Sequence, residues 1–414
     1  MTQLIDRVVA RKDFLLPLDE AQRRIAAAHD VRAGVETIAL ADAIGRVLAI
    51  DLLAPIDLPG ADNSAVDGYA VRFDDLLADE LTVLPLSGRT AAGISTDVPL
   101  SEGCAGRIFT GAVLPVGADT VLMQEDCDVV EGCICLPPGS RRGDNRRAAG
   151  EDIAHGALAL PAGRRLMPPD LALLAALGFD RIAVRKPLRV TVFSTGNEIA
   201  TPPATLRRGQ VYDANRFLLG GLLQRLHIDF THGGVLPDNA AATRTALREA
   251  AAGTDLIITS GGVSAGEEDH VRAAIEAIGR LDFWRVAIKP GRPVALGMLD
   301  GTPWLGLPGN PVAALVTFWA LGRPLLDRLG GAAPLPCPRL PVRSGFHHRK
   351  KAGLREYLRV QIAPDGTAHC HPKKGTGMLT SLTGSEALLE LTERMTSVAP
   401  GDLATCIPLT SVYG

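Results

Sequence analysis

Aromatic residues are scarce in this chain of 414 residues and make up only 4% of it. Proteins that bind single-stranded nucleic acid stack bases on aromatic side chains, so there is little material for that mode of recognition. Excess positive charge is lacking as well, since 43 lysines and arginines stand against 46 aspartates and glutamates. The formal net charge of -3 therefore predicts no basic field for DNA or RNA.

Long apolar runs are also missing. The most apolar helical stretch covers residues 312–321. It is much shorter than the roughly 20 residues that are needed to cross a bilayer. The first residues, MTQLIDRVVARKDF, contain no apolar segment of the length found in signal peptides. We therefore expect a cytoplasmic protein that does not contact membranes.

Paired cysteine motifs and two nucleotide-binding signatures are absent. The seven cysteines form no Cys-x-x-Cys pair, and their odd number fits a reducing compartment. We interpret Cys133 and Cys135 as structural thiols on one face of a strand. No Gly-x-Gly-x-x-Gly turn follows a strand and no Walker A sequence is present, which disfavours a dinucleotide oxidoreductase and a P-loop enzyme.

The character of successive segments indicates a multidomain α/β protein. A soft prior of about one domain per 150 residues gives roughly two to four domains. Short strand-like runs between Gly/Pro turns dominate one stretch, and a proline-rich segment at residues 332–341 has the composition of a linker. We predict an α+β N-terminal domain (residues 1–50 with 147–186), an inserted β-rich module (51–146), an α/β domain (187–331) and a C-terminal β-barrel-like domain (332–414).

Strands and helices alternate with short loops through residues 187–331, which predicts a doubly wound, largely parallel sheet. Ligands on such sheets bind beyond the carboxyl ends of the strands. Polar loops follow the predicted strands at residues 194–198, 237–238, 260–269 and 308–310. We expect these loops to converge on one edge of the sheet.

The stretch at residues 255–270, DLIITSGGVSAGEEDH, combines a strand, a loop of small residues and an acidic helix start. Glycines let the backbone approach a ligand, and free N–H groups at a helix start point at negative charge. The acidic residues would repel a bare anion unless a cation lay between them. The pattern favours a phosphate-bearing ligand with a divalent ion, and the alternative is an ordinary βα turn.

Two cations, Lys289 and Arg292, stand in a turn whose backbone is fixed by proline and glycine. Positive groups three positions apart suit an oxyanion, although a plain surface turn is the alternative. The helix start at residues 309–311 offers a second anion site. Combined with the carboxylates on the same edge, these groups suit phosphate-ester or anhydride chemistry with Mg²⁺.

Several of these stretches resemble the molybdopterin molybdenumtransferase family, called MoeA in bacteria and the gephyrin E-domain in animals. The matching stretches are PGADNSAVDGYAV (59–71), RIFTGAVLP (107–115), NRRAAGEDI (145–153), STGNEI (194–199), SGGVSAGEEDH (260–270), AIKPGRP (287–293) and LPGNPV (307–312). The resemblance spans essentially the whole chain. It implies insertion of molybdate into adenylylated molybdopterin with release of AMP, assisted by Mg²⁺ or a similar ion.

The resemblance also implies roles for individual residues. The catalytic set would be Asp62, Thr110, Asp152, Glu198, Asp238 and Asp269, of which Glu198 and Asp269 would bind the metal. The substrate-binding set would be Ser260, Gly261, Gly262, Ser264, Lys289, Arg292, Pro308, Gly309, Asn310, Arg355 and Thr376.

A homodimer with a shared active site is implied as well, in which Asp62 and Thr110 of one subunit meet the α/β domain of the other. Contacts with the adenylyltransferase and with molybdoenzyme maturation proteins would follow from this role. The chain departs from the family at Asn197, Arg292 and Ala313, where Asp, Lys and Ser are common. Two alternatives stay open, namely a relative that prefers tungstate and a scaffold that uses the fold to bind partners.

Overall fold

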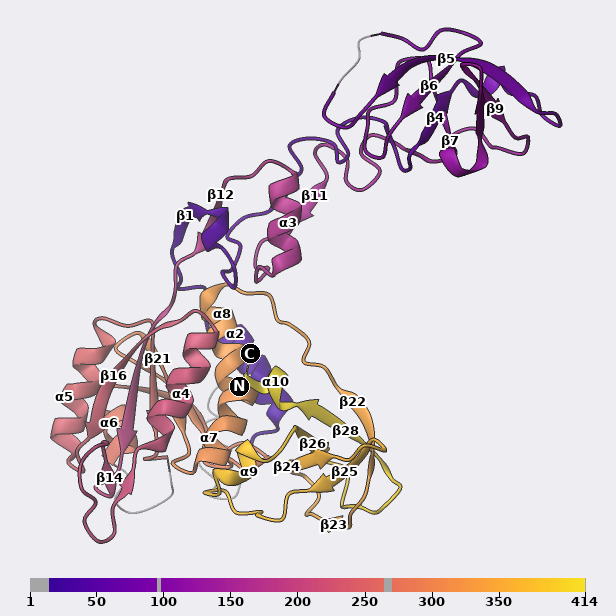
Figure 1. Ribbon diagram of the computed structural model, residues 1–414. Coiled ribbons are helices and arrows are strands. Elements are labelled where there is room, and N and C mark those ends of the chain that lie inside the picture. Colours follow the sequence, from indigo (N-terminus) through magenta and orange to yellow (C-terminus); the bar gives the residue numbers. More distant parts are fainter. Residues whose placement is uncertain (1–14, 95–97, 264–269, 414) are drawn as a thin grey trace, which may run out of the picture.

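The computed structural model describes residues 15–94, 98–263 and 270–413 of an elongated chain (Figure 1). The inserted β-rich module lies at one end, and the α/β and C-terminal domains lie together at the other. The small N-terminal domain connects them. Within the described ranges, no helix is long and apolar enough to span a bilayer.

The α/β domain contains a six-stranded sheet in the order β16-β13-β17-β21-β20-β18. Four neighbouring strands pair in parallel, whereas β20 pairs antiparallel with both β21 and β18, so the predicted largely parallel sheet is confirmed, with a mixed edge. The strands are β13 (Arg189–Thr195), β16 (Asp229–Leu236), β17 (Leu256–Ser260), β18 (Gly279–Trp284), β20 (Ala295–Leu299) and β21 (Thr302–Leu307). A small parallel pair, β14 (Ile199–Ala200) and β15 (Val211–Tyr212), extends from β13.

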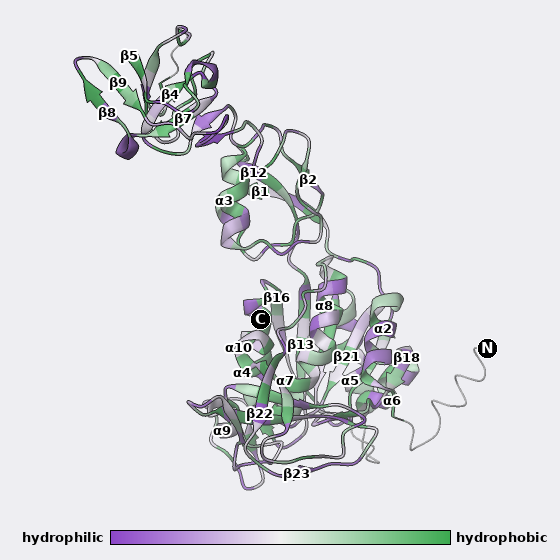
Figure 2. Ribbon diagram, turned by 90° about the vertical axis from the view of Figure 1, so that its right-hand side faces the viewer, coloured by the Kyte–Doolittle hydropathy of each residue, from purple (hydrophilic) through white to green (hydrophobic). Residues whose placement is uncertain are grey.

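Helices cover both faces of this sheet because alternate strand residues are apolar on each side. One core unites Leu219 and Leu223 with Val312 and Val316 over one face, and the other packs Leu247 and Ile275 over the opposite face. Figure 2 shows the apolar residues concentrated in these strands and in α7. The helices are α4 (Ala214–Arg225), α5 (Ala240–Ala251), α6 (His270–Ile278), α7 (Pro311–Thr317), the π-helical turn η4 (Phe318–Gly322) and α8 (Arg323–Gly330).

The N-terminal domain is built on a small core around Leu48, Leu166 and Leu174. Its elements are β1 (Val35–Ala39), η1 (Leu40–Asp42), β2 (Leu52–Leu53), β11 (Leu158–Leu160), α3 (Pro168–Ala176) and β12 (Arg181–Arg185). Strand β1 pairs with β12 and β2 with β11, both antiparallel. The preceding helix α2 (Leu18–Ala28) instead buries Ala21 and Ile25 in the core of the α/β domain. The domain boundaries given above stay a proposal, to which the structure adds this placement of α2.

The inserted module is a six-stranded sheet in the order β7-β4-β6-β5-β9-β8. Its elements are β4 (Gly68–Val71), η2 (Phe73–Asp75), β5 (Thr82–Thr90), β6 (Ala105–Ile108), β7 (Thr120–Met123), η3 (Gln124–Asp126), β8 (Asp128–Val130) and β9 (Cys133–Leu136). At its base, β3 (Asn63–Ser64) pairs with β10 (Arg146–Arg147), so the two chain crossings into the module lie side by side.

The C-terminal domain closes into a five-stranded barrel, as predicted, because β24 pairs with both β25 and β26. Its elements are β22 (Leu340–Ser344), β23 (His348–Arg349), β24 (Arg355–Ile362), β25 (Thr367–Cys370), α9 (Thr380–Thr383), β26 (Ala387–Leu391), β27 (Ser397–Val398), β28 (Leu403–Pro408) and α10 (Leu409–Tyr413). The two-residue strand β19 (Ile288–Lys289) of the α/β domain joins the edge of β24.

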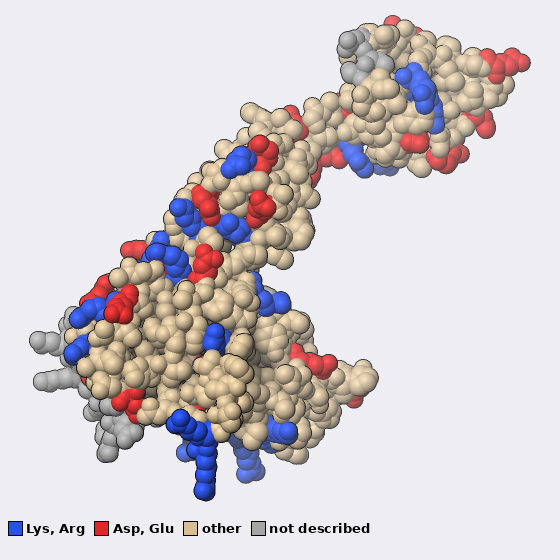
Figure 3. Space-filling view, turned by 60° about the vertical axis from the view of Figure 1, so that its left-hand side comes forward, with Lys and Arg blue, Asp and Glu red and all other residues tan. Residues whose placement is uncertain are grey.

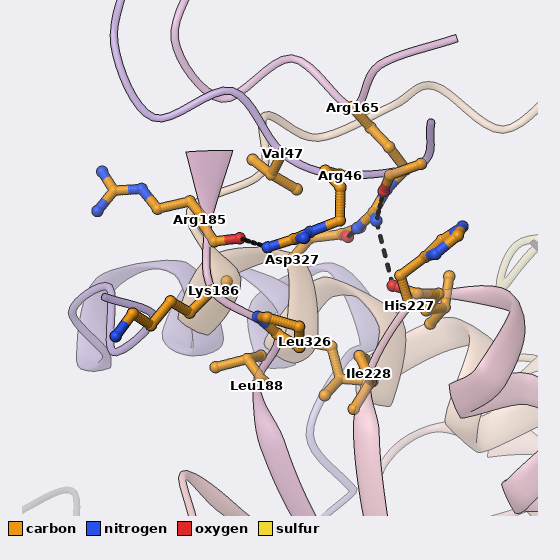
Figure 4. Close-up of a pocket in the computed structure, with 14 residues that line it drawn as sticks. Arg46, Val47, Arg165, Arg185, Lys186, Leu188, His227, Ile228, Leu326 and Asp327 are labelled. Atoms are coloured by element: carbon orange, nitrogen blue, oxygen red, sulfur yellow. Dashed lines mark hydrogen bonds and ion pairs between the residues drawn. The ribbon is translucent and has the colours of Figure 1, made fainter. Parts of the chain in front are cut away.

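The joint between the N-terminal and α/β domains is centred on Arg165 (Figure 4). Its guanidinium donates to the carbonyl oxygens of Gly45 and Leu226 at 2.9 and 3.2 Å, and it pairs with Asp327 at 3.2 Å. Burial lowers the pKa of Arg165, and Asp327 opposes this shift. A cavity of only about 30 Å³ remains at the joint. The two domains are thus tied by one side chain that binds backbone on both sides.

Charged residues of both signs alternate along this narrow part of the molecule. Figure 3 shows lysine and arginine side chains interspersed with aspartate and glutamate on the face that it presents. One such pair is Arg46 with Glu36. Arg46 also donates to the carbonyl oxygen of Arg185 at 2.8 Å, which adds a second polar tie within the N-terminal domain.

Candidate functional site

A cavity of about 850 Å³ lies at the carboxyl ends of the parallel strands. The loops after β13, β16, β17 and β21 line it, together with the N-terminal ends of α4 and α7. Gly377 and Leu379 of the C-terminal domain complete the wall. The residues of the predicted site that line this strand-end cavity are Glu198, Asp238, Ser260, Gly261, Gly262, Pro308, Gly309 and Asn310.

The cradle at residues 260–262 needs glycine at two positions. Gly261 has φ +96 and Gly262 has φ +65, which L side chains rarely adopt. A Cβ on Gly261 would lie 2.3 Å from the Thr195 hydroxyl oxygen, and its N–H donates to the carbonyl of Leu307 at 2.8 Å. The loop therefore turns tightly between two neighbouring strand ends and exposes backbone to the cavity. Ser264, the next predicted member, lies outside the described residues.

Asn215 is a buried residue of this site that sequence reasoning missed. Its side-chain amide donates to the Ser260 hydroxyl oxygen at 2.7 Å and to the Gly309 carbonyl at 2.8 Å. Its own Oδ1 has no hydrogen-bond partner among the described residues, although the residue is only 7% exposed and lines the cavity. Asn215 thus ties together two of the loops that line the cavity. In the sequence, the only sign of a role for Asn215 was its place at a helix start, residues 213–215.

The start of α4 is anchored by Asp213. One carboxylate oxygen accepts from the N–H of Arg216 at 3.0 Å as a helix cap, and the other accepts from the Ser194 hydroxyl at 2.5 Å. Ser194 is buried at the carboxyl end of β13. Asp213 and Asn215 together therefore fix α4 to three strand-end loops, and this arrangement sets the shape of the cavity floor.

The acidic side of the cavity carries Glu198 and Asp238, which are both exposed. The Asn197 amide donates to Asp238 at 3.0 Å. The Glu198 carboxylate lies over Gly196, where a Cβ would come within 2.3 Å of Oε2. Among the described residues, no group of three or more His, Cys, Asp or Glu side chains forms a ready metal site. Asp269, the second predicted metal ligand, lies outside the described residues.

Two exposed carboxylates suffice for one kind of metal ion. Mg²⁺ keeps several waters and is usually bound by one or two carboxylates together with phosphate oxygens of a substrate. Glu198 and Asp238 face the same cavity as the cradle at residues 260–262. The donors that are present therefore fit a Mg²⁺ ion that arrives with a phosphate ligand, and they do not fit a closed structural metal site.

The cationic turn at residues 289–293 borders the cavity through Pro293. Gly291 has φ +113, and a Cβ there would lie 2.2 Å from Thr317 Cγ2, so this turn packs closely on α7. Arg292 is exposed. Lys289 is half exposed, and its ammonium lies 2.7 Å from a carboxylate oxygen of Glu356. Both predicted cations thus stand beside the cavity rather than in its lining.

The structure places Arg355 in an ion-pair cluster. Its guanidinium lies 2.9 Å from Asp19 and 2.9 Å from Glu393, and its side chain is 14% exposed. Burial alone would lower the pKa of Arg355, but Glu393 and Asp19 raise it. Arg355 is therefore occupied by carboxylates in this structure and does not line the cavity.

Arg359, which sequence reasoning missed, supports the loop that precedes the cavity residue Gly377. It is 6% exposed, and its Nη2 donates to the carbonyls of Lys373 and Gly375 at 3.1 and 3.3 Å. Its Nε has no partner, and no carboxylate pairs with it among the described residues. Burial lowers its pKa. Arg359 therefore fixes the loop that carries Thr376, whose carbonyl accepts from the N–H of Val312 at 3.1 Å.

The remaining predicted residues belong to segments that pair with one another at the base of the inserted module. This module and the α/β domain lie at opposite ends of the chain (Figure 1). Asp62 pairs with Arg146 at 2.7 Å and accepts from the N–H of Ala149 at 2.8 Å. Thr110 donates through its N–H and hydroxyl to Asp67, which lowers the pKa of Asp67. Asp152 is exposed. One chain thus holds two separated groups of predicted site residues.

Removal of the Asn215 amide is expected to loosen the cavity. In Asn215→Ala the Ser260 hydroxyl and the Gly309 carbonyl lose their donor, and we expect about 1–3 kcal/mol of lost stability together with weaker ligand binding. Thr254→Ala is the matched control, because the buried Thr254 hydroxyl donates to the Arg189 carbonyl at the other end of β17. Thermal unfolding and substrate KM would be measured for both. Equal KM effects in the two variants would contradict the assigned role.

Comparisons with known proteins agree along the whole chain. Residues 16–178 match the MoeA N-terminal region (domain I and II), residues 191–328 a probable molybdopterin binding domain, and residues 341–409 the MoeA C-terminal region (domain IV). A molybdopterin molybdenumtransferase of Haemophilus influenzae is 35% identical over 97% of this chain and 100% of its own.

Gephyrin of Dictyostelium discoideum is 28% identical and covers 95% of this chain, which in turn covers 62% of that protein. Among solved structures, the molybdopterin biosynthesis MoeA protein of Pyrococcus horikoshii OT3 superposes with a TM-score of 0.82 at 27% identity, over 95% of this chain and 100% of that one.

Proposed function

Because this chain belongs to the MoeA family and is a molybdopterin molybdenumtransferase of molybdenum cofactor biosynthesis, we propose that it inserts molybdate into adenylylated molybdopterin and releases AMP with the help of Mg²⁺. The observation that carries this proposal is the strand-end cavity of about 850 Å³. A cradle of backbone and hydroxyl groups faces exposed carboxylates across it. Such a combination suits a phosphate-bearing substrate that carries a divalent ion.

Phosphate binding is assigned to the two loops that Asn215 holds together. The backbone at residues 260–262 and the Ser260 hydroxyl form one wall, and residues 308–310 form the other at the start of α7. N–H groups at a helix start are free to donate to an anion. These residues would hold the pterin phosphate and orient it without a change in their own charge.

Metal binding is assigned to the acidic side of the cavity. Glu198 would bind Mg²⁺ with Asp238 beside it, and Asp269 would be a further ligand outside the described residues. When bound, the ion would neutralise negative charge on the phosphate oxygens of the anhydride whose P–O bond is broken when AMP leaves. The contribution of Asn197 would be to hold the Asp238 carboxylate through its amide N–H at 3.0 Å.

Molybdate binding is assigned to the cationic turn and the neighbouring C-terminal loop. Lys289 and Arg292 supply two positive groups, and Arg292 can donate two parallel N–H bonds to one oxyanion. Thr376 would add a hydroxyl from the loop that Arg359 supports. Asp62, Thr110 and Asp152 would reach this cavity from a second copy of the chain in a homodimer.

The test is release of AMP from adenylylated molybdopterin by the purified protein. We expect release that requires both molybdate and Mg²⁺ and that is lost when the metal is chelated. Tungstate in place of molybdate separates a tungstate-preferring enzyme from the proposed one. Folded protein that releases no AMP under any of these conditions would refute the proposal and favour a scaffold role.

A further inference from the structure

The backbone of the C-terminal barrel is hydrogen-bonded to the start of the cationic turn. Strand β19 of the α/β domain pairs in parallel with the start of β24, so that Ile288 lies opposite Arg355 and Lys289 opposite Glu356. The N–H of Arg355 donates to the Ala287 carbonyl at 2.8 Å. A strand of one domain thus fixes the backbone of a lysine that belongs to the other.

Glu356 is a buried carboxylate at this junction. The residue is 3% exposed, and its Oε1 lies 2.7 Å from the Lys289 ammonium. Its Oε2 lies 3.3 Å from Nε2 of His348, although the two atoms are not aligned as a hydrogen bond. A buried carboxylate is costly unless a cation or donor compensates for it. The close contact with Lys289 meets that need.

Lys289 has a different environment, because its side chain is 50% exposed. An ammonium carries three N–H donors, and the contact with Glu356 uses one of them. The others can reach a second acceptor beside the cavity. Arg292 stands three residues further along the same turn and forms no ion pair within the described part of the chain.

From these contacts we infer that Glu356 is a positioning residue, which holds the Lys289 ammonium in place for the incoming oxyanion. The inference rests on the proposed function, because it takes Lys289 to bind molybdate. The lysine side chain is a flexible stem of four carbons, and it loses conformational entropy when its ammonium is held in one position. Glu356 orders the Lys289 side chain before the ligand arrives, so this entropy cost does not reduce the affinity for the oxyanion.

The carboxylate also acts against the oxyanion through like-charge repulsion. This repulsion acts over a longer distance than the 2.7 Å contact, and Lys289 lies at a half-exposed position where water screens it. Arg292 adds a second positive charge nearby. We therefore expect the gain from an ordered ammonium to exceed the loss from the Glu356 charge, so that removal of Glu356 weakens binding.

The experiment measures steady-state AMP release and equilibrium binding of sodium molybdate for the full-length protein and its variants. Glu356→Gln keeps the shape and removes the charge. We expect its KM and Kd for molybdate to rise about tenfold, with kcat at saturating molybdate and the KM for the nucleotide substrate within about twofold of wild type. In a Lys289→Met background the same change is expected to add less than about twofold.

Four results separate the outcomes. An equal effect of Glu356→Gln with and without Lys289, or a fall in the molybdate KM, overturns the inference. Glu356→Asp keeps the charge and is expected to bind molybdate better than Glu356→Gln, and a failure of this rescue also counts against it. If Glu356→Gln does not fold, the Glu356→Asp change in both backgrounds takes its place. If the wild-type protein shows no molybdate-dependent AMP release, the proposed function is refuted instead.

Discussion

A mixture of Asp62→Ala and Glu198→Ala subunits is expected to recover about a quarter of the wild-type rate of AMP release, because random exchange makes about half of the dimers mixed and each mixed dimer has one intact site. Each variant alone is expected to lose at least about a hundredfold in kcat/KM, since each removes a carboxylate proposed to act on the reacting groups. The rate would be measured before and after subunit exchange.

The expected recovery follows from the distance between the two residues in one chain. Glu198 lines the strand-end cavity, whereas Asp62 directly precedes β3 at the base of the inserted module. That module lies at the other end of the elongated molecule from the α/β domain (Figure 1). The contacts of Asp62 with Arg146 and with the N–H of Ala149 hold it to that module. A site that uses both residues therefore needs two chains.

A pair of variants on the same side serves as the control for this experiment. Glu198→Ala and Asp238→Ala both damage the cavity wall of the α/β domain, so a mixed dimer has no intact site and is expected to stay inactive. Recovery in this control, or no recovery with Asp62→Ala, would contradict a shared site. Mass measurement of the mixed dimers would first confirm that exchange took place.

Gly261→Ala is expected to reduce activity at least about tenfold while the protein stays folded. A residue with φ +96 and a Cβ costs about 1–2 kcal/mol in backbone conformation. The added carbon would also lie 2.3 Å from the Thr195 hydroxyl oxygen and 3.1 Å from the Thr195 carbonyl, so the cradle has to shift. Since Thr195 ends β13, this shift moves residues 260–262 away from the end of β13.

The matched control is Gly253→Ala. This glycine lies before β17, has no positive φ, and a Cβ there would meet nothing within 4 Å. Its replacement is expected to leave both the melting temperature and the KM for the nucleotide substrate close to wild type. If Gly261→Ala behaved in the same way as this control, residues 260–262 would not be a tight ligand cradle.

The sequence pattern was sufficient to predict the repeated strand-loop-helix units of the α/β domain. Apolar strands followed by short polar loops predicted the parallel strands β13, β17 and β21, and parallel strands bring loops such as residues 260–262 and 308–310 to one edge. The barrel followed from short strands in the last part of the chain. The sequence did not predict β18 as a strand, and the reversed direction of β20 could not be told from a parallel one, because strand direction leaves no mark on such short apolar runs.

Buried polar partners were beyond prediction. Asn215, Glu356 and Arg359 act through partners that are from 14 to 94 positions away in the chain, and no spacing rule links such residues. The opposite case is Arg355, which has the residue type of an anion ligand but pairs with Asp19 and Glu393, so its assignment stays a prediction. A charged side chain can be assigned only when its competing partners are known.

A small change of angle at the joint around Arg165 becomes a large displacement at the far end of the molecule. The inserted module lies far beyond this joint (Figure 1), so a small rotation about it displaces Asp62 by an amount that grows with the length of the arm. Catalytic groups tolerate misplacement of only about 0.5 Å. The hydrogen bonds from Arg165 to Gly45 and Leu226 therefore fix the direction in which the inserted module extends. In the homodimer proposed above, the accuracy of the shared site would depend on a side chain at a domain joint that does not line the cavity.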